Sequence, residues 1–347
     1  MQPSRRAFLF GRQTPLTPWQ AFRERLARGV QGRVQSLGTG PACRLCLVPA
    51  WLDDIRHARA LCAEYGVTLL LDGLEDAGTA LAPAVPGPIF VDPARTDPVF
   101  TDLTPEDPAS ADSTPADPAS PDLALDTQDG PPVLYVDPSL LNALTPESDA
   151  GQWLAQPGCR LGDLADAGLP QFRGAPAELT LAAWLAHAHG WTPGMTAASG
   201  LVGVDVLLSD GTTERLGPFG ASDLRPLRSA TVQRLVPALF QLSTSPDSVT
   251  CRNASRWPCR YRLDALVPAE SAEVNLAHLL LGHGGSLAWV ESLVLTPGEA
   301  WAGPASTPAA VGQGPALPPV PADAVGPARR LERRIKTAFD PLDLYGD

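Results

Sequence analysis

The chain has 347 residues, enough for one large domain or two ordinary ones, and 44% of them are hydrophobic, which is compatible with a buried core. Its formal net charge of −12 excludes the basic surface that binding to nucleic acid or anionic lipid requires. No apolar run approaches the roughly 18 residues of a membrane span. The pair Arg5-Arg6 resembles a twin-arginine export motif, but polar residues follow it where apolar ones are needed. We therefore expect a cytoplasmic protein with no transmembrane segment.

Six cysteines stand in the chain, and free thiols in a reducing compartment are their expected state. Cys43 and Cys46 have the spacing of a redox or zinc pair, but they fall on an expected strand, where residues three apart point to opposite faces. Cys251 and Cys259 are too far apart in the sequence for a zinc knuckle. The sequence therefore predicts no metal site.

Residues 1–40 are expected to form an N-terminal arm that carries one helix. Apolar residues recur at helical spacing between Trp19 and Val34, and the preceding Thr17-Pro18 pair is typical of a helix start. Both a helix packed on the surface and a partner-binding arm are compatible with this pattern.

Residues 42–95 carry the pattern of a first α/β subdomain. The expected elements are, in order, strand 44–49, helix 52–65, strand 67–71, a glycine-containing loop 71–79 and strand 88–92. A strand, a helix and a strand of these lengths predict a βαβ unit with parallel strands.

Residues 96–130 differ sharply in composition from both neighbours. They are rich in Pro, Asp, Ser, Thr and Ala, contain few large apolar side chains and are strongly acidic. Such a segment cannot bury enough surface to offset its chain entropy, so we expect a disordered acidic insertion. A solvated insertion and an acidic tether both fit this composition.

Residues 131–220 are expected to form a second subdomain. Its expected elements are strand 133–136, helix 138–144, strand 152–155, a helix ending at Gly168, helix 179–189, and a hairpin of strands that turns at Asp210-Gly211. Residues 221–300 mix helix and strand patterns (helices 231–242 and 273–282, strands 256–266 and 286–295), which favours a small α+β cap-like region. A Pro/Gly linker over 301–325 and a C-terminal helix over 326–347 complete the chain.

Several of these segments together resemble the FAD domain of the vanillyl-alcohol oxidase / p-cresol methylhydroxylase (PCMH) flavoproteins, and most closely the small FAD-binding subunit of bacterial glycolate oxidase. The likeness lies in the opening βαβ pattern, the Pro157-Gly158 turn, Thr180 in the family's Thr-x-Gly-Gly position, the Asp-Gly hairpin, and the closing Lys-x-x-Phe-Asp-Pro motif that begins at Lys336. It implies an α+β fold of the FAD-binding PCMH type with two subdomains.

The resemblance also implies non-covalent FAD and the residues that would hold it. Carried over position by position, these are Gly73, Gly78, Thr79, Gly158, Thr180, Gly194, Gly200, Gly203 and Asp205. Glycines serve this purpose because consecutive backbone N–H groups can cradle a phosphate only where no Cβ blocks the approach. No catalytic base is assigned, and His283 is a weak candidate because it lies in the cap-like half.

The chain departs from the family at two of these glycine-rich places. Where the family has a run of glycines after an arginine, residues 71–79 include the carboxylates Asp72, Glu75 and Asp76, whose charge is unfavourable beside a pyrophosphate. The family's Gly-Gly pair is replaced by Ala182 and Ala183. Their methyl groups would narrow the space for a flavin, or the two alanines simply extend the helix expected over 179–189, which is the favoured interpretation.

Two functions therefore remain open, and the sequence favours the first. One is an FAD-binding oxidoreductase subunit of the glycolate-oxidase type, which oxidises a small 2-hydroxy acid and passes electrons to partner subunits. The alternative is a flavin-less, non-catalytic structural or assembly subunit with a degenerate FAD-domain fold, since fold does not imply function. The two differ in whether the glycine-rich segments converge on one open pocket.

Overall fold

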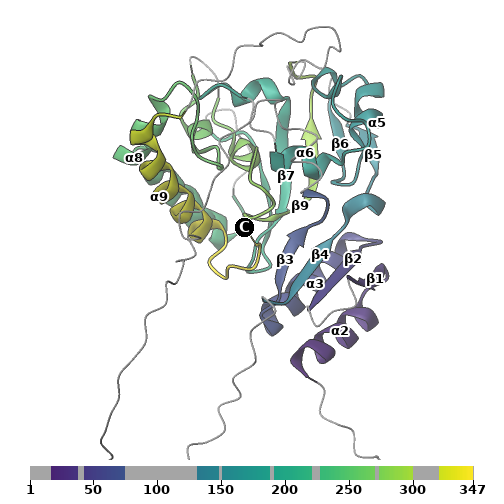
Figure 1. Cartoon of the computed structure of the whole chain (residues 1–347). Helices are drawn as coiled ribbons and strands as arrows, with labels where there is room; N and C mark the ends of the chain where they lie inside the picture. Colours follow the sequence, from purple (N-terminus) through teal and green to yellow (C-terminus); the bar gives the residue numbers. More distant parts are fainter. Residues whose placement is uncertain are drawn as a thin grey trace, which may run out of the picture.

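The computed structural model describes residues 17–37, 43–74, 131–147, 151–187, 191–220, 227–269, 273–299 and 320–346. These residues form two sheets, one of four strands and one of five, each with its own helices (Figure 1). The first sheet packs on one hydrophobic core, which also takes in Leu207 and Trp289 of the second sheet, and the second sheet packs on a larger core. The expected α+β fold with two subdomains is therefore confirmed.

The first subdomain is built on a sheet with strand order β1-β2-β4-β3. Its elements are α2 (Pro18–Gly29), β1 (Arg33–Ser36), β2 (Arg44–Val48), α3 (Leu52–Tyr65), β3 (Thr68–Leu71) and β4 (Val133–Val136). Strands β2, β4 and β3 are parallel, and β1 is antiparallel to β2. The predicted βαβ unit is confirmed, but β4 lies between its two strands. Alternate residues of β4, Leu134 and Val136, are fully buried in the core below α3.

Local sequence explains the helices of this subdomain. The Thr17 side chain and Gln20 form a reciprocal capping box at the start of α2, and Pro18 occupies the first turn. Helix α3 ends at Gly66, which adopts the left-handed conformation (φ 65°) that a C-terminal glycine allows.

The second subdomain contains the antiparallel sheet β5-β6-β9-β7-β8. Its strands are β5 (Leu144–Pro146), β6 (Trp153–Ala155), β7 (Leu201–Leu207), β8 (Thr213–Leu216) and β9 (Trp289–Leu295). Its α-helices are α5 (Leu161–Asp166), α6 (Leu181–His187), α7 (Ala230–Ser243), α8 (Pro246–Arg252) and α9 (Ala322–Phe339). Its short 3₁₀ turns are η1 (Pro138–Leu140), η2 (Pro170–Phe172), η3 (Thr196–Ser199), η4 (Leu263–Leu266) and η5 (Leu276–Leu280). The β7–β8 hairpin turns at Asp210-Gly211, as predicted.

The cap-like region expected over residues 221–300 is not a separate unit. Strand β9 comes from this region and occupies the centre of the second sheet, between β6 and β7. The side chains of β9 are buried on both faces except at Ser292, which is why the strand takes a central position. Helix α7 packs on the same core. Among the described residues, the part expected to be a cap therefore completes the second subdomain.

Two secondary-structure predictions in the same region were wrong. The segment 256–266, expected as a strand, forms turns and the 3₁₀ turn η4, and the helix expected over 273–282 is the shorter 3₁₀ turn η5. A buried ion pair accounts for the first difference, because Arg262 bonds Asp264 at 2.7 Å and both are about 1% exposed. Arg262 also donates to the carbonyl of Trp191, at 2.8 Å, so the segment follows these contacts and not a strand ladder.

Several predictions fall on residues outside the described ranges. These are the start of the N-terminal arm (1–16), the strand at 88–92, the acidic insertion at 96–130, the end of the helix predicted over 179–189, and most of the 301–325 linker. No helix of the described part is long and apolar enough to cross a membrane.

Contacts from two sides hold the subdomains together. On one side Arg56 of α3 makes a bidentate ion pair with Glu291 of β9, with N–O distances of 2.8 and 2.9 Å. On the other side the residues after α9 run along β3: the Leu69 N–H donates to the Leu344 carbonyl at 2.8 Å, and the Gly346 N–H donates back to Leu69 at 3.2 Å. The C-terminus thus lies between the two sheets, beside β3 (Figure 1).

Candidate functional site

A small cavity lies where the two sheets meet. It is lined by Leu71, Pro157, Ala182, His283, Gly285, Ala288, Trp289 and Val290. These residues come from the end of β3, the loop before α5, the start of α6, the loop before β9 and the start of β9. The cavity therefore sits at the junction of both subdomains, as a cofactor site shared between them would.

Three of the segments expected to hold a flavin converge on this cavity. Leu71 immediately precedes Asp72-Gly73, Pro157 precedes Gly158, and Ala182 follows Thr180 by two residues. Gly73 has a positive φ of 76°, and no atom lies within 4 Å of the place where a Cβ would stand. Gly158 is closely packed, because a Cβ there would lie 2.0 Å from the carbonyl oxygen of Pro138. Gly78 and Thr79 lie outside the described residues.

Of the described residues predicted to bind FAD, none lines the cavity itself, and four of them lie outside the segments that line it. Gly200 immediately precedes β7 and Gly203 lies near its start, where Leu201 pairs with Leu295. The cavity adjoins the other end of this strand pair, where Leu207 pairs with Trp289. Gly194 donates its backbone N–H to Asp264 at 2.9 Å. Asp205 forms an ion pair with Arg215 of β8 at 2.7 Å. These four residues support the sheet and its loops.

The backbone donors nearest the cavity are already used within the protein. At the start of α6 the Leu181 N–H donates to the Cys159 carbonyl and the Ala182 N–H donates to the Pro157 carbonyl, both at 2.8 Å. The Ala183 N–H donates to the Thr180 hydroxyl at 3.2 Å, so Thr180 caps this helix. A helix N-terminus binds phosphate through free N–H groups. Since these three are occupied, the start of α6 has none of them to offer a pyrophosphate.

The size of the cavity decides whether FAD fits. Its volume is about 20 Å³. One water needs about 10–15 Å³ of such space, whereas ligand pockets have about 300–1,000 Å³. Among the described lining residues there is no lysine or arginine that could pair with a pyrophosphate. The described residues, in this arrangement, do not fit FAD.

Two polar groups border this space. The indole nitrogen of Trp289 is buried and makes no hydrogen bond within the described protein, so a water in the cavity would satisfy it. His283, the candidate base, is 3% exposed and lines the same cavity. Its backbone carbonyl accepts from the Ser286 hydroxyl at 2.8 Å, which orders the loop before β9. A cavity of this size has no room for a hydroxy-acid substrate beside His283.

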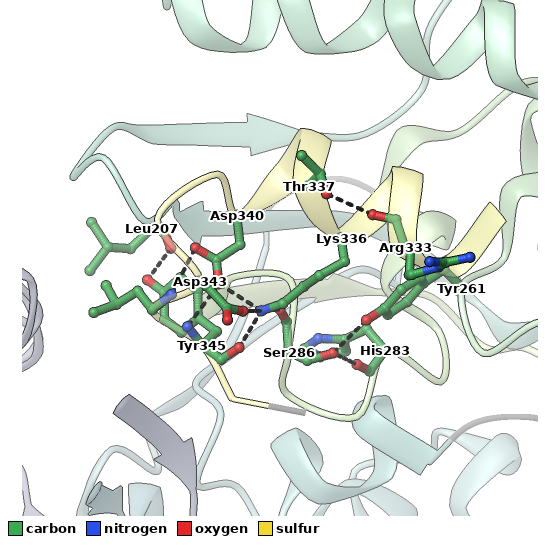
Figure 2. A network of polar contacts seen from close by, with 11 residues as sticks. Leu207, Tyr261, His283, Ser286, Arg333, Lys336, Thr337, Asp340, Asp343 and Tyr345 are labelled. Carbon is green, nitrogen blue, oxygen red and sulfur yellow. Dashed lines mark hydrogen bonds and ion pairs between the residues drawn. The ribbon is translucent and has the colours of Figure 1, made fainter. Parts of the chain in front are cut away.

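The C-terminal motif closes the junction from the side of β3. Lys336 of α9 is nearly buried, and its Nζ donates to the Asp340 carboxylate at 2.7 Å, the Ser286 carbonyl at 2.9 Å and the Tyr345 carbonyl. Asp340 in turn accepts the backbone N–H groups of Leu344 and Tyr345, at 3.0 and 2.8 Å. Figure 2 shows Lys336 at the centre of this network, reaching both the cavity loop and the tail.

Tyr345 links the tail to the second sheet. Its hydroxyl donates to the Leu207 carbonyl at 2.7 Å and is also hydrogen-bonded to the backbone of Trp289, the residue paired with Leu207. The side chain is 1% exposed, and this burial raises its pKa well above the ordinary value. The hydroxyl therefore stays protonated and closes the end of the β7–β9 ladder.

Sequence reasoning found Lys336 and Asp340 through their motif but missed Tyr345 and Trp289. The tyrosine stands where the chain departs from the family's usual ending, so the motif gave it no role. Trp289 begins a strand that was assigned to a cap. The apolar run after Gly285 predicts a strand, but only the pairing of that strand with β7 places Trp289 beside the cavity.

The described residues contain no cluster of three or more His, Cys, Asp or Glu that could hold a metal ion. None of the six cysteines forms a disulfide.

Comparison with known proteins assigns the chain to no family and finds only distant similarity to solved structures. No protein-family model matches the chain, and a search of curated proteins finds no match. Among solved structures it is similar to Physcomitrella patens BBE-like 1 (TM-score 0.39, 12% identity, covering 80% of this chain and 44% of that one). It is also similar to a carbohydrate oxidase from Microdochium nivale (0.38, 12%, 80% and 43%) and to 6-hydroxy-D-nicotine oxidase from Arthrobacter nicotinovorans (0.36, 12%, 78% and 43%).

These neighbours include named oxidases, and the chain spans less than half the length of each. At such TM-scores and identities the likeness carries no inference about the activity of this chain. The fold class is established by the two sheets of the chain itself.

Proposed function

We propose that this chain is a non-catalytic structural subunit, built on an FAD-domain fold that no longer holds a flavin. The observation that carries the proposal is the small size of the cavity that the described residues leave where the sheets meet, about 20 Å³. The occupied N–H groups at the start of α6 support it, since a phosphate would have to displace the carbonyls of Pro157 and Cys159. The buried methyl groups of Ala182 and Ala183, 5% and 3% exposed, stand where the resembling family has glycines.

The proposed partners are other subunits of a glycolate-oxidase-like complex. The resemblance in the Lys336 motif and the hairpin motivates this choice, because a subunit that keeps the fold without the cofactor retains surfaces that its partners recognise. Purification of the tagged chain from its own cells tests the proposal. Co-purification of oxidoreductase subunits in fixed ratio is expected, and a chain that elutes alone under mild conditions contradicts the assembly role.

A second candidate is an FAD-binding oxidoreductase that oxidises a small 2-hydroxy acid and passes electrons to a partner. One observation favours it: the ends of β3, the Pro157-Gly158 turn and the start of α6 meet at one cavity together with His283. FAD would supply the hydride chemistry when bound, while the protein would orient the substrate. This candidate requires the junction to open from about 20 Å³ to the several hundred that a flavin occupies.

One experiment separates the two candidates. The purified full chain is mixed with excess FAD and desalted, and its visible spectrum is recorded. The structural role predicts a colourless protein. Retained flavin bands at about 370 and about 450 nm would establish a cofactor site and make 2-hydroxy acids the substrates to screen.

A matched variant makes the colourless result informative. In the double substitution Ala182→Gly and Ala183→Gly the two methyl groups are removed without altering the polar contacts of Thr180. We expect this variant to stay colourless, because the backbone donors remain occupied. Flavin binding by the variant alone would show that the methyl groups are the whole obstacle.

A further inference from the structure

Two cysteines of the second subdomain touch each other. The Sγ atoms of Cys251 and Cys259 are 3.7 Å apart, and the two side chains are 0% and 5% exposed. Cys251 lies in the last turn of α8, and Cys259 lies in the turn that leads to η4.

The pair sits at a structural junction. The Cys259 thiol also points toward the carbonyl of Ala328 in α9, at 3.9 Å. On the outer side of the same junction Arg330 of α9 forms an ion pair with Asp247 of α8, at 2.6 Å. Figure 1 shows α8 and α9 packed side by side at the outer edge of the molecule. A bond between the sulfurs would therefore tie α8 to the turn on which α9 rests.

We propose that Cys251 and Cys259 are a redox-active pair that forms a reversible intramolecular disulfide when a peroxide oxidises it. The sulfurs already lie in contact and need to approach from 3.7 Å to a bond length of about 2.05 Å. Seven residues lie between the two positions, so the bond closes a short loop that contains Trp257 and Pro258.

The chemistry assigns different parts to the two sulfurs. Cys259 donates a hydrogen bond to Cys251, and this bond lowers the pKa of Cys251 below its ordinary value while that of Cys259 is raised. The thiolate is the nucleophile in such reactions, so Cys251 attacks one peroxide oxygen. The O–O bond breaks, water leaves, and Cys251 becomes a sulfenic acid.

Cys259 then attacks the sulfenic sulfur. The S–S bond forms, the S–O bond breaks and a second water leaves. Two thiols have lost two electrons to the peroxide, and their two protons are in the two waters. A peroxide is small enough to reach the buried pair during local opening of the α8–α9 contact.

The test uses the full chain, reduced, desalted, treated with hydrogen peroxide and then alkylated. Tryptic digestion should yield a linked pair of peptides, Leu235–Arg252 and Trp257–Arg260, lighter than their sum by two hydrogen atoms, and dithiothreitol should separate them. The oxidised chain should also unfold at a midpoint about 2–5 °C higher, because the bond constrains the unfolded chain.

Substitutions identify the pair. In Cys259→Ser the linked peptides should vanish, and a sulfenic-acid reagent such as dimedone should label Cys251. The matched control Cys62→Ser removes a thiol that is equally buried but lies in the other subdomain, and it should leave the linkage intact. The proposal is overturned if the native chain shows no linked pair at peroxide doses that oxidise its methionines, or if linkage appears only after the chain is denatured.

Discussion

Lys336 is the residue on which the polar contacts of the C-terminal tail depend. Its Nζ is shared by Asp340, Ser286 and Tyr345, and the Asp340 carboxylate is fully buried. Replacing Lys336 with Met leaves this carboxylate without its cation. We expect the free energy of unfolding to fall by about 2–4 kcal/mol, measured by urea denaturation.

Arg333 offers the matched control, because it lies one turn earlier on α9 and is exposed. Arg333→Met should change stability by no more than about 0.5 kcal/mol. Equal losses in the two variants would mean that the effect belongs to helix charge and not to the buried network.

His278 makes stability depend on pH. Burial lowers its pKa from 6.5 to about 4, and its imidazole is held neutral between the Thr196 hydroxyl and the Leu201 carbonyl. The unfolded chain gains this proton first, so the contribution of His278 is complete above pH 6.5 and is lost as the pH falls toward 4. The loss should be about 3 kcal/mol. Unfolding measured from pH 7 to 4 should show a shallower slope in His278→Gln than in the parent chain; parallel slopes would contradict the assignment.

At the scale of elements, the tail after α9 acts as a short added strand. It covers the edge of β3, where Leu69 exchanges hydrogen bonds with Leu344 and Gly346. A chain that stops after Leu342 loses this pairing but keeps Asp340. Hydrogen exchange of the Leu69 amide should then quicken by at least tenfold, while amides of β2, which pair with β1 and β4, keep their protection. Unchanged exchange at Leu69 would mean that the tail contact is not formed in solution.

The sequence predicts best those elements whose determinants lie within the segment itself. Helix α3 and the β7–β8 hairpin were predicted closely, because a left-handed Gly66 and an Asp-Gly turn are signals within the segment itself. The position of β4 between β2 and β3, and of β9 in the centre of the second sheet, depends on partners more than 60 residues away. No local pattern specifies such pairing, so β9 was assigned to a cap.

The candidate site shows the same division. Pro157 and Ala182 line the cavity, so Gly158 and Thr180 lie in segments beside it without lining it themselves. Gly200 lies away from it, because a strand of this length places its two ends about 20 Å apart and the motif did not say which end adjoins the cavity. Asp205 is instead held by its ion pair with Arg215. Tyr345 could not be found at all, since its role arises from contacts with two sheets at once.

At the scale of the molecule, the two cores are expected to unfold as one unit because ion pairing and tail pairing join them. Arg56 of α3 forms an ion pair with Glu291, whose side chain is only 6% exposed. The control pair, Arg28 and Glu24 of α2, is solvent-exposed, with side chains 77% and 41% exposed. In Arg56→Leu, Glu291 stays in the junction without its cation. We expect a loss of about 1–3 kcal/mol in that variant and about 0.5 kcal/mol or less in Arg28→Leu.

The shape of the unfolding curve tests this coupling more directly than its midpoint. Combining Arg56→Leu with the stop after Leu342 removes the contacts on both sides of the junction. The parent chain should give coincident transitions by tryptophan fluorescence and far-ultraviolet circular dichroism, and the combined variant should give two separated ones. Of the eight tryptophans, Trp19 and Trp51 belong to the first subdomain. Five described ones belong to the second and are buried or half-buried (Trp153, Trp184, Trp191, Trp257 and Trp289), so fluorescence should mainly follow the second core. Coincident transitions in the combined variant would show that the apolar contact between the sheets, around Leu207 and Trp289, suffices to keep the molecule cooperative.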